Sequence, residues 1–230
     1  MTRAFAVAAA ALAFAPAAHA ACPPPTQPPA VPQVTAPRWV AGVLVTEYFP
    51  APERWFGGPL VHAPGLALAH RSDWLYSARG LAMQGEGIGT NGRLYHFAGP
   101  YSLAWLNARG APTYPCRRAP GYWSDGRPVR ISPGATFALG PSLSLTYWHD
   151  VAVDPRMIRY GSRVFIPAYC STPSHGWFTA ADTGGAILGR HVDVFRAPPA
   201  RRWESRVLRA QRIFVVPPGY RAPPSVRCPR

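Results

Sequence analysis

Acidic side chains are concentrated in one part of this chain. Only ten of its 230 residues are acidic, and four of these, Asp150, Asp154, Asp182 and Asp193, lie between residues 150 and 193. The same stretch has the strongest strand patterns in the sequence, among them VAVD, SRVFIPAY, GWFTAAD and HVDVFRA. Carboxyl groups placed at strand ends or among apolar neighbours are candidates for acid–base chemistry. We therefore take this stretch as the candidate site.

The most unusual of these aspartates is Asp193. It stands between two valines in HVDVF, and strand alternation places it on the same face as His191 and Phe195. Aspartate is disfavoured inside a strand, so Asp193 either faces water or is held there for a reason. A solvated strand face is the plainer interpretation, and the sequence leaves both open.

Asp154 and Asp182 also have plain interpretations. Asp154 precedes Pro155, and an Asp-Pro pair commonly begins a turn. Asp182 ends the strand GWFTAA and opens the tight turn Asp-Thr-Gly-Gly, where an aspartate can serve as an Asx-turn alone. Local pattern does not decide between these structural roles and a chemical one.

Other chemistries find little support in the sequence. His191 and Asp193 could be half of a metal site, but no further cluster of histidine or cysteine completes it. No G-x-S-x-G turn presents a serine nucleophile. The segment GEGIG (85–89) lacks the lysine and the following helix of a phosphate loop. We therefore expect neither a metal nor a cofactor.

The elements that must position these residues are short strands. With 29 prolines and 21 glycines, the chain has few stretches long enough for a helical bundle. Strand patterns begin at Trp39 with VAGVLVTEYF and end with RIFVV at 212–216. Residues 51–80 have the composition of a long surface loop, and 200–210 show the one clear helix pattern. The prediction is an all-β closed barrel with long loop-rich insertions and at most one or two short helices.

The first twenty residues have the features of an export signal. Arg3 is followed by an apolar segment, and Ala18-His19-Ala20 is a cleavage site, so 1–20 are predicted to be a signal peptide. Residues 21–38 are a proline-rich linker and 217–230 a proline-rich tail. No later stretch is apolar enough for a membrane helix. We expect an exported protein in the periplasm, at the outer membrane or in the cell wall, and leave open whether Cys22 is lipidated.

Four cysteines and a strong positive charge fit an exported protein. An even number of cysteines in an oxidising compartment favours disulfides, which we predict between Cys116 and Cys170 and between Cys22 and Cys228. All 24 basic residues are arginine, and the net charge is +14. For an exported protein an anionic wall polymer is a better partner than nucleic acid, although a solvated arginine surface explains the charge equally well.

Two segments resemble a known family. VAVDPRMIRYGSRVFIPAY and AADTGGAILGRHVDVF closely resemble the three-aspartate (3D) domain, which is shared by the C-terminal part of the membrane-bound lytic transglycosylase A family and by stationary-phase and resuscitation-associated wall proteins. The three aspartates that name it match Asp154, Asp182 and Asp193. VTEYFP (45–50) and RIFVV resemble its opening and closing strands. The resemblance implies a single domain over 39–216 with an insertion at about 51–140.

The family suggests what the site does. Membership implies a double-psi β-barrel acting on peptidoglycan glycan strands, where one carboxylic acid cleaves the bond between N-acetylmuramic acid and N-acetylglucosamine without water. By this resemblance Asp193 is the acid/base, Asp182 lies beside it, and Asp154 holds the constellation or the substrate. Tyr48 is expected to stack on a sugar, and the turn Gly184-Gly185 to let backbone approach one.

Alternatives stay open at this point. A non-catalytic wall-binding module, or ordinary hydrolysis by two aspartates, fits the same residues. We expect a monomer. The chain also departs from the family where Ile158-Arg159-Tyr160-Gly161 replaces the usual Ile-Pro-Leu-Gly, and where Leu188 replaces a lysine, so the shape of the groove is a separate question.

Overall fold

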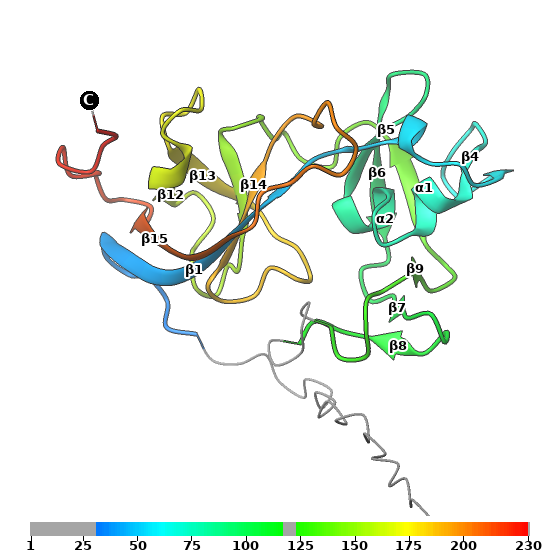
Figure 1. Ribbon diagram of the computed structural model, residues 1–230, viewed down its shortest axis with the longest axis horizontal. Coiled ribbons are helices and arrows are strands. Elements are labelled where there is room, and N and C mark those ends of the chain that lie inside the picture. Colours follow the sequence, from blue (N-terminus) through cyan, green and yellow to red (C-terminus); the bar gives the residue numbers. More distant parts are fainter. Residues whose placement is uncertain (1–30, 117–122, 230) are drawn as a thin grey trace, which may run out of the picture.

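The protein has two lobes joined by several crossings of the chain. A computed structural model describes residues 31–116 and 123–229, and Figure 1 shows a β-barrel on one side and a second lobe around β5, β6, α1 and α2 on the other. The chain runs from β1 in the barrel into the second lobe and returns to the barrel at β11. The predictions for the signal peptide, for the linker up to residue 30 and for Cys22 lie outside the described residues.

Six strands close the barrel in the order β1-β14-β11-β13-β12-β15. They are β1 (Arg38–Tyr48), β11 (Asp150–Val153), β12 (Arg163–Phe165), β13 (Trp177–Asp182), β14 (His191–Phe195) and β15 (Leu208–Val216), with a 3-10 turn η2 (Pro167–Tyr169) after β12. The pairs β1–β14 and β11–β13 are parallel, and the other four are antiparallel. The all-β class and the closed barrel predicted for this chain are confirmed.

Alternation along the strands decides which residues fill the barrel. Val43 and Val45 of β1 and Val192 and Val194 of β14 are almost fully buried, because side chains in a strand point alternately to the two faces of the sheet. The other members of the barrel core are also mostly aliphatic, among them Val151, Val153, Val164, Ile166, Ala180, Ile213 and Val215. The residues between them therefore face the outside of the barrel.

The second lobe contains short elements in three small sheets. One sheet has the order β10-β6-β5-β2, a second pairs β3 with β4, and a third has the order β8-β7-β9. The elements are β2 (Ala51–Pro52), η1 (Glu53–Trp55), β3 (Leu60–Val61), β4 (His70–Arg71), α1 (Ser72–Tyr76), α2 (Leu81–Gln84), β5 (Glu86–Ile88), β6 (Leu94–Gly99), β7 (Trp105–Leu106), β8 (Pro112–Thr113), β9 (Arg130–Ile131) and β10 (Thr136–Leu139). Within 31–116 and 123–229, no helix is both long and apolar enough to cross a membrane.

The core of the second lobe is aromatic. Trp74 is fully buried, and its ring nitrogen donates a hydrogen bond of 2.8 Å to the carbonyl oxygen of Ala51. A buried contact of 3.0 Å joins a carboxylate oxygen of Glu53 to Nδ1 of His70 beside it. The prediction of a long surface loop over 51–80 is therefore wrong. The helices and strands of this segment are very short and pack through large aromatic rings. Elements of this length are too short to produce a periodic hydrophobic pattern in the sequence.

The segment after β14 crosses to the second lobe instead of forming a helix. Trp203 has a φ of 65° and Ala210 a φ of 53°, and neither value is compatible with a right-handed helix. The Trp203 ring packs edge-on against Trp55 and Phe56, with ring centroids 5.2 and 5.3 Å apart. The predicted helix over 200–210 is wrong, because Trp203 packs on the second lobe whereas Leu208 and Ala210 belong to strand β15.

The cysteine pairing also differs from the prediction. Cys170 and Cys228 form a disulfide with Cα atoms 5.6 Å apart, which ties the C-terminal tail to the turn after η2. The predicted pairs Cys116–Cys170 and Cys22–Cys228 are wrong, since each uses one member of this bond. Cys116 is itself disulfide-bonded, and Cys22 lies outside the described residues. Connectivity depends on which loops meet in space, and spacing in the sequence does not encode that.

Candidate active site

A row of paired residues on the outer face of the barrel brings two of the predicted aspartates together. Thr46 of β1 pairs with Asp193 of β14, Asp193 pairs with Ala152 of β11, and Ala152 pairs with Asp182 of β13. Adjacent strands lie about 4.8 Å apart, so the backbones at Asp182 and Asp193 are separated by about 10 Å. The side chain between them is only the methyl group of Ala152.

A β-bulge turns Asp182 toward this row. Val151 pairs with Ala180 and the next residue, Ala152, pairs with Asp182, so β13 has one extra residue, Ala181, at this point. Strict alternation would place Asp182 with Ala180 in the core. The bulge moves it to the outer face, in the same row as Asp193.

The pKa of Asp193 is raised, so this carboxyl group keeps its proton to a higher pH than an ordinary aspartate does. Its side chain keeps some contact with solvent although it lies well below the protein surface. Burial raises its pKa to about 7, and the negative charges of Asp182 and Glu47 add to the rise, while a hydrogen bond of 2.6 Å with Thr46 opposes it. An acid with this pKa can both give and take a proton near neutral pH.

Asp182 is held by its neighbours from two sides. The Tyr48 hydroxyl donates a hydrogen bond of 2.6 Å to one carboxylate oxygen, and the backbone N–H of Thr183 donates one of 2.7 Å to the other. Burial raises the pKa of Asp182, and the charge of Asp150 adds to the effect. The pKa of Tyr48 is raised as well, by burial and by the nearby Asp182. Asp182 is thus a fixed negative neighbour of Asp193.

Asp154 has a different environment at the end of β11. It is 2% exposed, and one of its oxygens accepts a hydrogen bond of 2.6 Å from the backbone N–H of Gly189. Arg156 contacts both oxygens, from Nε at 2.9 Å and from a terminal nitrogen at 2.7 Å. Burial alone would raise the pKa of Asp154, but these hydrogen bonds outweigh it and hold the pKa below its ordinary value. Asp154 anchors the loop between β13 and β14.

The two glycines of that loop differ in their surroundings. A Cβ on Gly184 would lie 3.1 Å from the side chain of Ile187, whereas a Cβ on Gly185 would meet nothing within 4 Å. The backbone N–H of Ile187 donates a hydrogen bond of 2.9 Å to Gly184, which closes the turn. Gly185 is exposed. The close approach of a ligand to this turn stays a prediction.

The second lobe contributes a buried carboxyl group that the sequence reasoning missed. Glu86 of β5 is 6% exposed and accepts hydrogen bonds from the backbone N–H and the hydroxyl of Ser142, at 3.0 and 3.4 Å. Burial raises its pKa, and the charge of Asp182 raises it further. Glu86 therefore faces the barrel site from the other lobe. The only local signal was an acid in a short strand between glycines.

Three further residues of this part of the molecule were not singled out by sequence patterns. Glu47 is buried, accepts a hydrogen bond of 2.9 Å from Tyr169 and forms an ion pair of 2.9 Å with Arg196. Thr46 contacts Asp193 directly. The ring of Tyr147 packs against Phe195 at 4.9 Å and keeps 36% of its surface exposed. Strand alternation could have found Thr46, but the others depend on contacts between distant segments.

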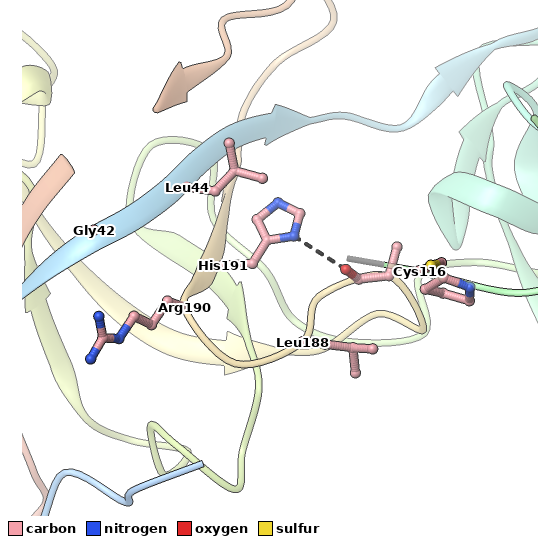
Figure 2. Close-up of a pocket in the computed structure, with 8 residues that line it drawn as sticks. Gly42, Leu44, Cys116, Leu188, Arg190 and His191 are labelled. Carbon is pink, nitrogen blue, oxygen red and sulfur yellow. Dashed lines mark hydrogen bonds between the residues drawn. The ribbon is translucent and has the colours of Figure 1, made fainter. Parts of the chain in front are cut away.

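A shallow cavity of about 270 Å³ continues this face beyond His191. It is lined by Leu44 of β1, by Leu188 and Arg190 of the loop before β14, and by Cys116 of the second lobe. Figure 2 shows the His191 ring between β1 and that loop, to which it is hydrogen-bonded, and Arg190 pointing away from it. Among the residues that the structure describes, no group of three histidine, cysteine or acidic side chains is arranged to hold a metal ion.

A family model matches part of the barrel, and two curated proteins match short parts of the chain. Residues 149–200 match the family model of the 3D domain, which confirms the resemblance for that segment. The chain is 51% identical over 45 residues to the cell wall-binding protein YocH of Bacillus subtilis, and 39% identical over 61 residues to the putative cell wall shaping protein YabE of the same organism. These matches cover 20% and 26% of this chain and only 14% of each relative.

Among the solved structures to which the chain is similar are lytic transglycosylases. Escherichia coli MltA with bound chitohexaose is 15% identical with a TM-score of 0.45, covering 76% of this chain and 71% of that one. A membrane-bound lytic murein transglycosylase from Agrobacterium tumefaciens is 12% identical with a TM-score of 0.42, covering 80% and 77%.

Proposed function

We propose that this protein cleaves peptidoglycan glycan strands between N-acetylmuramic acid and N-acetylglucosamine as a lytic transglycosylase, with Asp193 as its single acid/base. One observation carries the proposal: Asp193 lies on the outer face of the barrel as a partly exposed residue, and burial of its carboxyl group raises the pKa to about 7. The 3D-domain match over 149–200 supports it, because the reaction implied by that resemblance needs one such group.

Asp193 would act twice in each turnover. First its carboxylic acid protonates the glycosidic oxygen as the bond from that oxygen to the muramoyl C1 breaks. The resulting carboxylate then takes the proton of the muramoyl C6 hydroxyl as O6 bonds to C1. Asp193 ends protonated, as it began, and no water is consumed. A pKa near the working pH suits a group that must give and retake a proton.

The neighbours of Asp193 would tune and position it. Asp182, held by Tyr48, keeps a negative charge nearby and so favours the protonated acid. Because the Tyr48 hydroxyl is bound to Asp182, the exposed ring of Tyr147 is the better candidate to stack on a sugar. Asp154 would act indirectly, by holding the loop that contains Gly184 and Gly185.

The proposal includes a location and a domain organisation. Peptidoglycan lies outside the cytoplasm, so residues 1–20 would direct export, and the barrel of 39–216, with its insertion at about 51–140, would act in the periplasm, at the outer membrane or in the wall. A monomer suffices, because each group assigned to the site comes from one chain.

Mass spectrometry of digested peptidoglycan tests this function. We expect purified protein to release muropeptides with 1,6-anhydro ends, and Asp193→Asn to release none above background. Reducing ends in place of anhydro ends would instead indicate hydrolysis. Intact walls after digestion would contradict cleavage of either kind.

A binding module is the second candidate. It is favoured by the 51% identity over 45 residues to a protein named for cell-wall binding, and by the net charge of +14, which suits an anionic polymer. Co-sedimentation with purified walls, without any soluble product, would support this candidate over the enzyme.

A further inference from the structure

Two side chains connect the carboxyl group of Asp193 to the loop before β14. Nδ1 of His191 lies 3.2 Å from the carbonyl oxygen of Ala186, and Nε2 lies 2.8 Å from the hydroxyl oxygen of Thr46. That hydroxyl oxygen lies 2.6 Å from Oδ1 of Asp193. Figure 2 shows the first of these contacts as the dashed line from the His191 ring. The three contacts form one continuous chain.

As long as Oδ2 of Asp193 carries no hydrogen, two arrangements satisfy all three contacts. A carbonyl oxygen only accepts, so Nδ1 of His191 carries a hydrogen. Thr46 has a single hydroxyl hydrogen, which goes either to Asp193 or to Nε2. If Thr46 donates to the Asp193 carboxylate, Nε2 must also carry a hydrogen and the ring is a cation. If Thr46 donates to Nε2, the ring is neutral and Asp193 must be protonated and donate to Thr46.

Both arrangements contain the same number of protons. They differ only in whether the extra proton sits on the carboxyl group or on the ring. Removing that proton would leave two lone pairs facing each other across one of the short contacts, which is unfavourable in a partly buried site. The geometry therefore retains one proton within the chain.

We propose that Asp193, Thr46 and His191 share one exchangeable proton, which passes between the carboxyl group and the ring through the Thr46 hydroxyl. The O–H bond of Asp193 breaks as its hydrogen bonds to Thr46, and the original hydroxyl hydrogen of Thr46 passes to Nε2. The hydroxyl is regenerated, and the net change is one proton moved from Asp193 to His191. Thr46 and His191 are thus positioning residues.

This sharing would let Asp193 change between its acid and base forms without exchange with solvent. The use in catalysis rests on the proposed function, but the proton sharing itself does not. Charged groups from the surrounding strands bias the position of the proton: Asp182 from β13 and Glu47 from β1 both favour the protonated carboxyl group. The neighbouring Arg190 points away from the ring.

Nuclear magnetic resonance of the histidine ring nitrogens tests the sharing without any activity assay. We expect neutral His191 to carry its hydrogen on Nδ1. We also expect Asp193→Asn to lower the pKa of His191 by about one unit or more, a tenfold change in proton affinity. The same comparison in a Thr46→Val background should show a much smaller effect, because valine keeps the shape but removes the hydroxyl. A Thr46→Ser background should preserve it.

Two results would overturn the proposal. One is a neutral His191 ring with its hydrogen on Nε2. The other is an unchanged effect of Asp193→Asn in the Thr46→Val background, which would mean that the charges act directly through space. The exposed His62 provides a matched control, since His62→Gln should leave the His191 titration as it is.

Kinetics provide the second measurement. Thr46→Val and His191→Gln should each lower kcat about tenfold, less than loss of the acid itself, with little change in KM. Thr46→Ser should restore most of the rate. A lower kcat without the change in His191 titration would assign these residues a purely structural role and overturn the relay. If wild-type protein cleaves no glycan but the titrations remain coupled, the proposed function fails and the proton sharing stands.

Discussion

Asp154 follows the end of β11 and Asp193 lies in the neighbouring strand β14 of the same barrel, and their surroundings are opposite. Asp154 is contacted at both oxygens by Arg156 and receives a backbone hydrogen bond from Gly189. Asp193 receives a hydrogen bond from a neutral hydroxyl, and its charged neighbours Asp182 and Glu47 are negative. The pKa of the first carboxyl group is lowered and that of the second is raised.

The difference separates a structural carboxylate from a reactive one. Hydrogen bonds and a nearby cation stabilise the ionised form, so Asp154 contributes to stability as an anion. Burial and nearby anions destabilise the ionised form, so Asp193 lowers stability when it ionises. The barrel thus contains the same residue type in two environments, and the environment of each carboxyl group sets the direction of its pKa shift.

Replacing Asp193 should give the largest effect. Asp193→Asn keeps the size of the side chain but cannot give and retake a proton. We expect release of anhydromuropeptides to fall at least about a hundredfold, with the free energy of unfolding unchanged or increased at pH 8. Release rates together with urea denaturation check this. Full activity in a folded variant would remove Asp193 from the mechanism.

Replacing Asp154 should act on stability. Asp154→Asn leaves Arg156 and the N–H of Gly189 with a weaker, neutral partner in a buried position. We expect the free energy of unfolding to fall by about 2–3 kcal/mol, measured by urea denaturation at pH 7. Arg156→Gln should cost less, because the bond from Gly189 remains. Equal stability of wild type and Asp154→Asn would contradict the anchoring role.

The pH dependence of stability should show the two carboxyl groups with opposite signs. The pKa of Asp154 is lowered on folding, so its contribution is present above its unfolded value of about 3.9 and is lost as the pH falls through its folded value. Asp193 has a folded pKa of about 7, so stability should decline as the pH rises from about 4 to about 7.

Unfolding free energies of wild type and the two Asn variants across pH 3–8 measure this contrast. Asp193→Asn should remove the decline between about pH 4 and pH 7, and Asp154→Asn the loss at acid pH. If the unfolding free energies of both variants had the same pH dependence, the surroundings would not give these two carboxyl groups different pKa values.

The smallest effect should come from Asp182, because burial, and not Asp182, is the main cause of the raised pKa of Asp193. Asp182→Asn removes one negative neighbour and should lower the pKa of Asp193. The pH optimum of glycan cleavage should then move to lower pH while activity is retained. Tyr48→Phe provides a comparison, since it releases Asp182 without removing the charge. A shift to higher pH in Asp182→Asn would contradict the electrostatic role.

The strands of the barrel could be predicted from the sequence much better than the strands of the second lobe. In the barrel, Val43, Val45, Val192 and Val194 alternate with outward residues, so strands could be predicted from the pattern. In the second lobe most strands have two or three residues, too few for any period to appear. The aromatic rings of its core come from segments that are far apart in the sequence. Trp203 belongs to the same group of rings, and in the sequence it contributed to a false helix pattern.

The amino-acid sequence alone determined the all-β class, the strand positions of the barrel, and the identity of Asp154, Asp182 and Asp193 as residues of interest. Local alternation and one family motif suffice for these. Only the tertiary structure decided that a bulge at Ala181 turns Asp182 outward, since a bulge depends on the partner strand. It also decided the disulfide between Cys170 and Cys228, and the raised pKa of Asp193. The burial of a side chain and the charges around it depend on segments that lie far apart in the chain, so a local sequence pattern cannot predict them.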